Sequence, residues 1–259
     1  MTAEDAVVPW GQELFIPSER EQRRLHLLAE VFDPHSIALL DRIGLSSGWH
    51  CLEVGAGTGS LLPTMAARVG AAGRVVATDL DTRFMDHHHG GVVEVVRHDV
   101  QGEEPPAGRF DLIHARLVLE HLPDRQRVVE RLLASLSPDG VLCVEATSWV
   151  PAAAVVGDYG RALASLMAAG HRLLGSDLSW ARTFPLPLQR VGLTKVEAEG
   201  RTVVVRGGTP HAELMYLTFA QPASAGLLPD VAMAQIGALL LDPTFVDHSA
   251  TMTAAWGWA

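Results

Sequence analysis

The sequence predicts an α/β fold with a doubly wound parallel sheet, and three observations lead to that class. Short apolar segments alternate strictly with helical patterns between residues 49 and 146. A loop with three glycines follows the first apolar segment directly. Hydrophobic residues make up 48% and charged residues 19% of the 259 residues, which is enough for one large α/β domain or for a core domain with a small cap. Because strands of a parallel sheet are buried on both faces, short apolar strands joined by helices favour this architecture.

The first predicted element is a helix over residues 18–44. Ser18 and Glu21 form a capping box, and apolar residues then recur at helical spacing. Pro34 interrupts or restarts this helix, because proline removes a backbone donor.

Strands and helices then alternate up to residue 146. The strands are predicted at 49–54, 74–78, 92–97, 110–114 and 141–146. The helices are predicted at 58–69, about 82–87 and 117–136, and a turn at 138–140 precedes the fifth strand. Pro63 falls in the first turns of its helix, where proline is tolerated.

Beyond residue 150 the alternation loosens, and the pattern predicts completion of the sheet together with a helical cap. Helical patterns cover 155–174 and 209–241, the second broken at Pro222 and Pro229. Strand patterns flank Gly200 within 193–205, and a last strand is predicted within 250–258. We therefore expect an N-terminal helical segment (1–45), a central core (46–150) and a C-terminal part (151–259), with cap insertions at about 152–185 and 209–241.

Charge and hydropathy limit the partners. The formal net charge is −10, whereas binding to nucleic acid without sequence preference requires a basic surface. Residues 1–15 carry acids where a secretory signal carries basic residues, and they lack a sustained apolar core. The longest apolar helical candidate, 231–241, is far shorter than the roughly 20 residues that a bilayer requires. We expect a cytoplasmic protein with a small-molecule partner, no nucleic acid and no membrane, and the sequence leaves a homodimer open.

The glycine loop lies within CLEVGAGTGS, residues 51–60. No lysine follows the glycines, so the phosphate-loop pattern is absent, and the serine at position 60 breaks the dinucleotide pattern GxGxxG. Gly55, Gly57 and Gly59 instead follow Glu53, a carboxylate that suits a cationic ligand better than a pyrophosphate. The alternative is a plain tight turn from strand to helix.

Two further acids follow the next strands. Asp79 ends the second strand, at the position from which a carboxylate accepts hydrogen bonds from ribose hydroxyls. Asp99 follows the third strand, where a carboxylate can accept from an exocyclic amine such as that of adenine. Each acid alone is more often a solvated loop residue. Together with Glu53 they predict a site for a nucleoside whose other end is positively charged.

The run from EVGAGTG through ATDLD, RHDV and FDLIHARLVLEHLPD to LSPDGVLCVE resembles the class I S-adenosylmethionine-dependent methyltransferases over about residues 20–150. Within that family it is most similar to the small-molecule, natural-product type of actinomycetes. The resemblance implies S-adenosylmethionine as cofactor, S-adenosylhomocysteine as product and a Rossmann-like fold. It also implies a seven-stranded, mostly parallel sheet in the order 3-2-1-4-5-7-6. The sixth strand is then expected at about 193–198, with a continuation over 201–206 left open, and an antiparallel seventh at 251–257.

The resemblance also implies which residues hold the cofactor. Gly55, Ala56 and Gly57 would pass beneath the methionine part, in the loop that also contains Glu53 and Gly59. The remaining contacts would be Asp79 with Leu80 at the ribose, Asp99 with Val100 at the adenine, and Arg116 or its backbone over the methionine end.

This strand order bears on the two cysteines, Cys51 and Cys143. The first and fifth strands flank the fourth, so they lie about 9–10 Å apart. A disulfide requires Cα atoms within about 7 Å. Both thiols are therefore predicted to be free, buried and inert.

Several histidines and one tyrosine are candidates for catalytic or structural roles. His121, after the fourth strand, is a candidate general base, or equally a residue that shapes the pocket wall. Tyr159 and His171, on the predicted lid helix, are further candidates to reach the acceptor. His114 is expected to be a satisfied core histidine. The tract at 87–89 resembles a metal site, but no acid or cysteine has ligand spacing, so we expect it to end a surface helix and to bind no metal.

We expect the acceptor pocket to be built from about 18–30, 147–185 and 209–241, which are rich in Leu, Met, Trp and Phe. That composition suits a hydrophobic small molecule, although the same residues could pack the cap onto the core. One alternative is an enzyme of this fold that keeps the cofactor but catalyses a cyclisation, a pericyclic step or a decarboxylation. Another is a non-enzymatic nucleotide-binding or regulatory protein.

Overall fold

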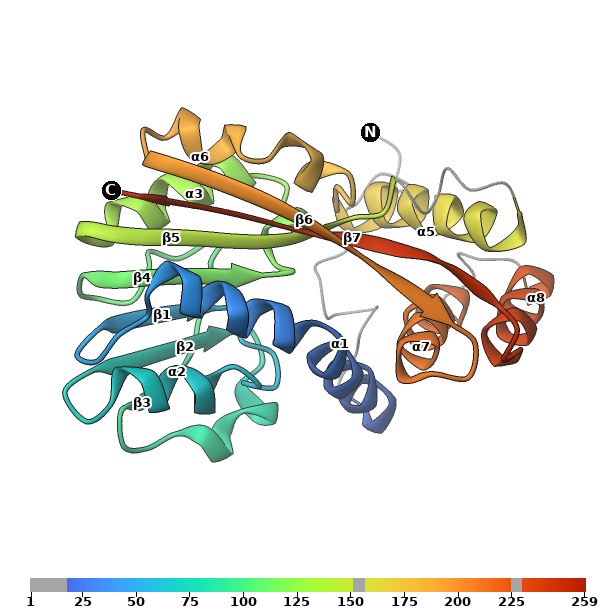
Figure 1. Ribbon diagram of the computed structural model, residues 1–259, viewed down its shortest axis with the longest axis horizontal. Helices are drawn as coiled ribbons and strands as arrows, with labels where there is room; N and C mark the ends of the chain where they lie inside the picture. Colours follow the sequence, from blue (N-terminus) through green and yellow to red (C-terminus); the bar gives the residue numbers. More distant parts are fainter. Residues whose placement is uncertain (1–17, 151–156, 225–229) are drawn as a thin grey trace. The chain divides into compact units, whose positions relative to one another are not determined.

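The computed structural model describes residues 18–150, 157–224 and 230–259. It contains a seven-stranded sheet in the order β3-β2-β1-β4-β5-β7-β6, as predicted (Figure 1). The strands are β1 (His50–Val54), β2 (Arg74–Asp79), β3 (Val93–Arg97), β4 (Phe110–Arg116), β5 (Leu136–Ser148), β6 (Thr194–Arg206) and β7 (Val246–Trp258). The pairs among β1 to β5 are parallel, and β7 runs in the opposite direction, which confirms the expected mostly parallel sheet.

Helices and short 3-10 turns connect these strands. The α-helices are α1 (Glu19–Ile43), α2 (Leu62–Val69), α3 (Arg125–Ala134), α5 (Asp158–Leu174), α6 (Leu186–Arg190), α7 (Pro210–Ser224) and α8 (Asp230–Leu241). The 3-10 turns are η2 (Thr82–Phe84), η3 (Asp86–His88), η4 (Leu119–His121) and η5 (Trp180–Thr183). The expected helix start at residue 155, the break at Pro229 and residues 1–17 lie outside the described residues.

The chain folds as two compact units, which we call the sheet unit and the helical unit. The sheet unit contains residues 32–146, 183–199 and 253–259, and the helical unit contains the rest. The chain passes from one unit to the other within α1, η5, β6 and β7 and near the end of β5.

The core of the sheet unit lies between the strands and two helices. Every second residue of a strand faces the same side, so Cys51, Leu112 and Cys143 share one face of β1, β4 and β5. Leu39 of α1 and Met65 of α2 are fully buried in the same apolar cluster. Figure 1 shows the sheet-unit part of α1 and helix α2 in front of the strands and α3 behind them, as in a doubly wound fold.

The helical unit has an apolar core of its own, formed by α5, α7, α8, the end of β6 and Phe245, which directly precedes β7. The Tyr159 ring packs edge-on against Phe219 and Phe245, with ring centroids 6.2 and 5.3 Å apart. These aromatic contacts and buried apolar side chains of the three helices, among them Leu163, Met215 and Leu240, give the unit a continuous core.

The predicted long helix at 117–136 is wrong. Strand β4 continues to Arg116, Leu117 takes a positive φ of 57°, and only the short turn η4 follows. Leu122 is extended (ψ 131°) because the residue before a proline avoids the helical conformation. The helix α3 therefore begins after Pro123, at Arg125.

Smaller corrections have local causes. Helix α1 continues through Pro34 without a break, and α7 passes Pro222 to end at Ser224. The helix predicted at 58–69 begins only at Leu62, because the positive φ of Gly59 extends the loop. The helix predicted at 82–87 is two 3-10 turns, η2 and η3, separated at Met85.

Candidate functional site

The loop after β1 is the first part of the candidate site. Gly55, Gly57 and Gly59 have φ values of 65°, 60° and 73°, which glycine adopts without strain. A Cβ at Gly55 would lie 2.2 Å from the Val118 side chain, and one at Gly59 would lie 2.8 Å from the His88 ring. A Cβ at Gly57, by contrast, would have no atom within 4 Å apart from those of its chain neighbours. The loop is thus packed at both ends and open in the middle.

The carboxylate of Asp79 anchors this loop. It accepts hydrogen bonds from the backbone N–H of Gly57 at 2.8 Å and of Asp81 at 3.1 Å. Burial raises the pKa of Asp79 above its ordinary value, and these two hydrogen bonds oppose the shift. The adjacent Leu80 is 44% exposed. The end of β2 therefore offers a carboxylate beside an exposed apolar side chain.

Asp99 lies two residues after the end of β3, in a turn. Its Oδ1 accepts from the N–H of Gln101 at 2.9 Å, and its own N–H donates to Glu103 at 3.0 Å. The carbonyl of Val100 accepts from Arg131 at 2.6 Å. Local hydrogen bonds thus hold Asp99 after the end of β3, and Arg131 of α3 holds Val100.

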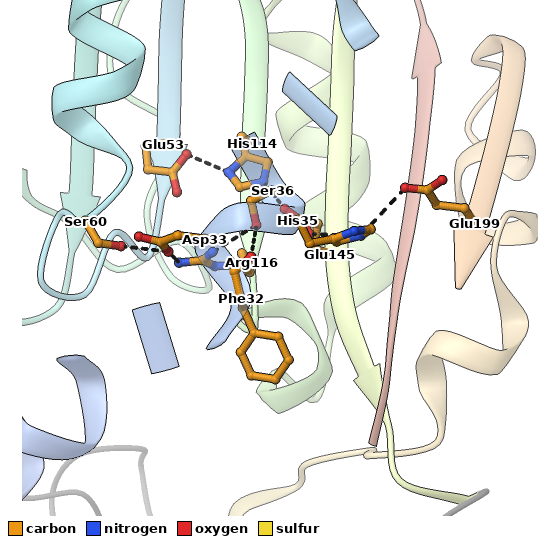
Figure 2. Close-up of polar contacts among 10 residues, drawn as sticks. All are labelled: Phe32, Asp33, His35, Ser36, Glu53, Ser60, His114, Arg116, Glu145 and Glu199. Atoms are coloured by element: carbon orange, nitrogen blue, oxygen red, sulfur yellow. Dashed lines mark hydrogen bonds and ion pairs between the residues drawn. The ribbon is translucent and has the colours of Figure 1, made fainter. Parts of the chain in front are cut away.

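A buried triad of charged side chains crosses β1, β4 and β5. Glu53 and His114 are register partners, and Glu145 lies on the same face of β5. His114 Nδ1 lies 2.7 Å from Glu53, and Nε2 lies 2.8 Å from Glu145 (Figure 2). Burial disfavours the imidazolium, but the two carboxylates outweigh it and raise the pKa of His114 to about 10. The prediction of a satisfied core histidine is confirmed.

Arg116, at the end of β4, is held by the sheet-unit part of α1. Its guanidinium donates to Asp33 and to the hydroxyl of Ser36, each at 2.8 Å. Asp33 also accepts from the hydroxyl of Ser60 in the glycine loop at 3.1 Å (Figure 2). Asp33 therefore ties α1 both to the loop and to the arginine that was expected over the methionine end.

The sequence reasoning missed Asp33, Ser36 and Glu145. Glu145 stands in an otherwise apolar strand, and that polar interruption is a pattern that could have revealed it. Asp33 and Ser36 lie in a helix 27 or more residues from the groups they contact, and no local pattern marks them.

The three candidate bases occupy different positions, and of these only His121 shares a unit with the glycine loop. It ends η4, which begins directly after Val118, the residue packed on Gly55. Tyr159 is buried in the helical unit, where burial raises the pKa of its phenol and its hydroxyl has no hydrogen-bond partner among the described residues. His171 is exposed on α5.

The histidine tract ends η3, as expected. The rings of His87 and His88 lie 4.0 Å apart, and His89 Nδ1 accepts from the N–H of Val95. Over residues 18–150, 157–224 and 230–259, no three His, Cys, Asp or Glu side chains group so that they could hold a metal ion. Within those same ranges, no helix is both long and apolar enough to cross a membrane.

The chain is similar in sequence to known methyltransferases. A family model described as a methyltransferase domain matches residues 20–192. The nocamycin O-methyltransferase of Saccharothrix syringae is 35% identical over 118 residues, which cover 43% of this chain and 42% of that protein. The ubiquinone/menaquinone biosynthesis C-methyltransferase of Hahella chejuensis is 26% identical over 113 residues, which cover 40% of this chain and 45% of that protein. The match therefore spans less than half of either curated relative.

A solved structure extends the similarity to nearly the whole chain. It is the cyclopropane-fatty-acyl-phospholipid synthase-like protein of Lactobacillus casei, with a TM-score of 0.59 and 16% identity. The similar region covers 93% of this chain and 94% of that one. At this identity the similarity supports the fold.

Proposed function

The chain belongs to the methyltransferase domain family, and we propose that it transfers a methyl group from S-adenosylmethionine to an oxygen, nitrogen or carbon atom of a hydrophobic small molecule. The observation that carries this proposal is the open space above Gly57, whose N–H is held by Asp79. S-Adenosylmethionine joins a nucleoside to an amino-acid end with positive charges, so a glycine loop flanked by carboxylates suits both parts.

The residues around the loop fit this cofactor. The loop itself would pass beneath it, with the open position at Gly57 leaving room that a side chain would fill. The contacts we propose are Gly55, Ala56, Gly57 and Gly59 as the floor, Asp79 and Leu80 at the ribose, Asp99 and Val100 at the adenine, and Glu53 and Arg116 at the methionine end. When bound, the cofactor supplies a methyl group already activated on a sulfonium sulfur.

The chain's own residues then have to position the acceptor in line with that methyl group and exclude water. A base is needed where the acceptor is a phenol, a hydroxyl or a protonated amine. We assign this role to His121, because its turn follows the residue that packs on Gly55. Tyr159 suits it less, since burial raises the pKa of its phenol, and His171 is exposed.

The acceptor is proposed by class only. One relative is named for transfer to oxygen and another for transfer to carbon, so the relatives leave the accepting atom open. The net charge of −10 supports a small molecule over nucleic acid. We place this activity in natural-product biosynthesis, in line with the resemblance to small-molecule methyltransferases.

Binding of S-adenosylhomocysteine, measured by calorimetry, tests the cofactor site. Asp79→Ala removes the carboxylate that anchors the loop, so we expect binding to be abolished. Asp86→Ala, at an exposed aspartate of η3, is the matched control and should bind like the parent protein. Unchanged binding in Asp79→Ala would overturn the site assignment.

Product analysis then tests the reaction. Methyl transfer predicts one S-adenosylhomocysteine for each methylated acceptor when candidate hydrophobic phenols, alcohols and amines are incubated with the protein. Turnover of an acceptor without S-adenosylhomocysteine would instead indicate a non-methylation step on the same fold. Cofactor binding without turnover of any acceptor would favour a non-enzymatic nucleotide-binding protein.

A further inference from the structure

Three charged side chains stand where the apolar core of the sheet would otherwise continue. Glu53, His114 and Glu145 lie on one face of β1, β4 and β5, and none is more than 4% exposed. Burying charges costs folding free energy even when they are paired, and apolar side chains of similar size are often at least as stabilising. Stability alone therefore does not account for this triad.

The geometry around the central residue matches its imidazolium form. His114 meets a carboxylate oxygen at each ring nitrogen, Glu53 at Nδ1 and Glu145 at Nε2. A neutral imidazole has one N–H donor, whereas the imidazolium has two. Two ionised carboxylates can both accept a hydrogen bond only from the cation. The hydrogen bond from His114 lowers the pKa of Glu145 despite its burial, and the carboxylates raise the pKa of His114, so the triad carries the charges minus, plus, minus.

Two contacts hold Glu53, and its second carboxylate oxygen is left to bind another partner. Its backbone carbonyl accepts from the hydroxyl of Thr78 at 3.2 Å, and its Oε2 meets His114. Figure 2 shows the other carboxylate oxygen pointing away from the His114 ring. Glu53 lies two residues before Gly55, at the end of β1 from which the glycine loop starts.

We propose that His114 is a positioning residue for the cofactor. Held as a cation by Glu145, it fixes the Glu53 carboxylate so that the free oxygen receives the ammonium group at the amino-acid end of S-adenosylmethionine. Glu145 acts one step further away, by orienting the ring and stabilising its charge. The inference rests on the proposed function, because it concerns the same cofactor site.

Two ligands distinguish this role from general structural support. Adenosine contains only the nucleoside part, whereas S-adenosylhomocysteine adds the amino-acid end. In His114→Gln the affinity for S-adenosylhomocysteine should fall about 10- to 100-fold, the loss typical of removing a buried charged partner. The affinity for adenosine should change less than about twofold, because His114 does not serve the nucleoside end. Equal losses for both ligands would overturn the inference.

A double-mutant cycle tests whether His114 acts through Glu53. If it does, Glu53→Gln combined with His114→Gln should lose no more affinity for S-adenosylhomocysteine than the weaker-binding single variant. Losses that multiply would show two independent contributions and would overturn the proposal.

A rescue variant keeps the test decisive if His114→Gln folds poorly. In His114→Gln combined with Glu145→Gln, the amide introduced at 114 can donate to Glu53 and accept from the amide introduced at 145. We expect this pair to restore at least half of the lost binding free energy, whereas no recovery would overturn the inference. If the parent protein binds neither ligand, the proposed function fails; losses confined to the variants bear on the inference alone.

Discussion

The backbone N–H of Gly57 donates a hydrogen bond to the carboxylate of Asp79 over 2.8 Å. The two residues are 22 positions apart, and the bond joins the loop after β1 to the carboxyl end of β2. Gly57 has a φ of 60°, with no atom within 4 Å of the position that a Cβ would take. The acid that would bind ribose therefore also holds the loop open.

The first prediction concerns the methyl group that Gly57→Ala would add in this space. Gly91→Ala is the matched control, since Gly91 has a φ of 59° and no atom within 4 Å of its Cβ position. Each variant should lose roughly 1–2 kcal/mol of unfolding free energy, because alanine is strained at positive φ. Only Gly57→Ala should also lose at least about tenfold in affinity for S-adenosylhomocysteine, as the methyl meets the ligand. Equal affinities in calorimetry would contradict the assigned floor of the site.

The second prediction concerns the guanidinium group of Arg116. Its side chain is 9% exposed and donates through separate nitrogens to Asp33 and Ser36. Lysine carries the same charge at one point and cannot reach both groups, so Arg116→Lys should cost about 1–3 kcal/mol of unfolding free energy in urea. Arg83→Lys is the control, because Arg83 also bonds its aspartate through two nitrogens but is 68% exposed. The control should change the free energy of unfolding by less than about 0.5 kcal/mol. A similar loss in both variants would count against a stabilising role of the two Arg116 hydrogen bonds.

These contacts show what the sequence could and could not predict. The glycine loop and Asp79 were predictable, because glycines, apolar runs and acids at strand ends are local patterns. The strand order was predictable only through the resemblance to the methyltransferase family. The bond between Arg116 and Asp33 spans 83 residues, and neither the helix period nor the strand period encodes such a pairing. Asp33 therefore became visible only when the fold brought α1 to the loop.

The misjudged helix at 117–136 has a related cause. Its apolar spacing fits a helix, but Leu117 takes a positive φ and Pro123 forces Leu122 into an extended conformation. Val118 is thereby placed against Gly55. The apolar spacing alone therefore mispredicted this segment, because the proline and the positive φ of Leu117 prevent a continuous helix.

The third prediction concerns the two thiols. Cys51 and Cys143 are free and fully buried on strands that flank β4, and burial raises the pKa of both thiols well above the ordinary value. The native protein should therefore react with neither iodoacetamide nor a disulfide reagent at pH 8, since the thiolate is the reactive form. Mass spectrometry should show both cysteines modified only after unfolding in urea. A disulfide, or rapid labelling of the native protein, would be inconsistent with this packing.

The fourth prediction follows from the pKa of His114, which is about 10 in the folded protein against an ordinary value of 6.5. A group that binds its proton more tightly when folded adds stability that is complete below about pH 6.5 and is lost as the pH rises through 10. Between these limits the contribution falls by about 1.4 kcal/mol per pH unit. Urea unfolding at pH 7.5, 8.5 and 9.5 should thus show a steeper loss of stability in the parent protein than in His114→Gln. The other titrating groups are common to both proteins and cancel in the comparison, so parallel profiles would mean that His114 is not an imidazolium in the folded state.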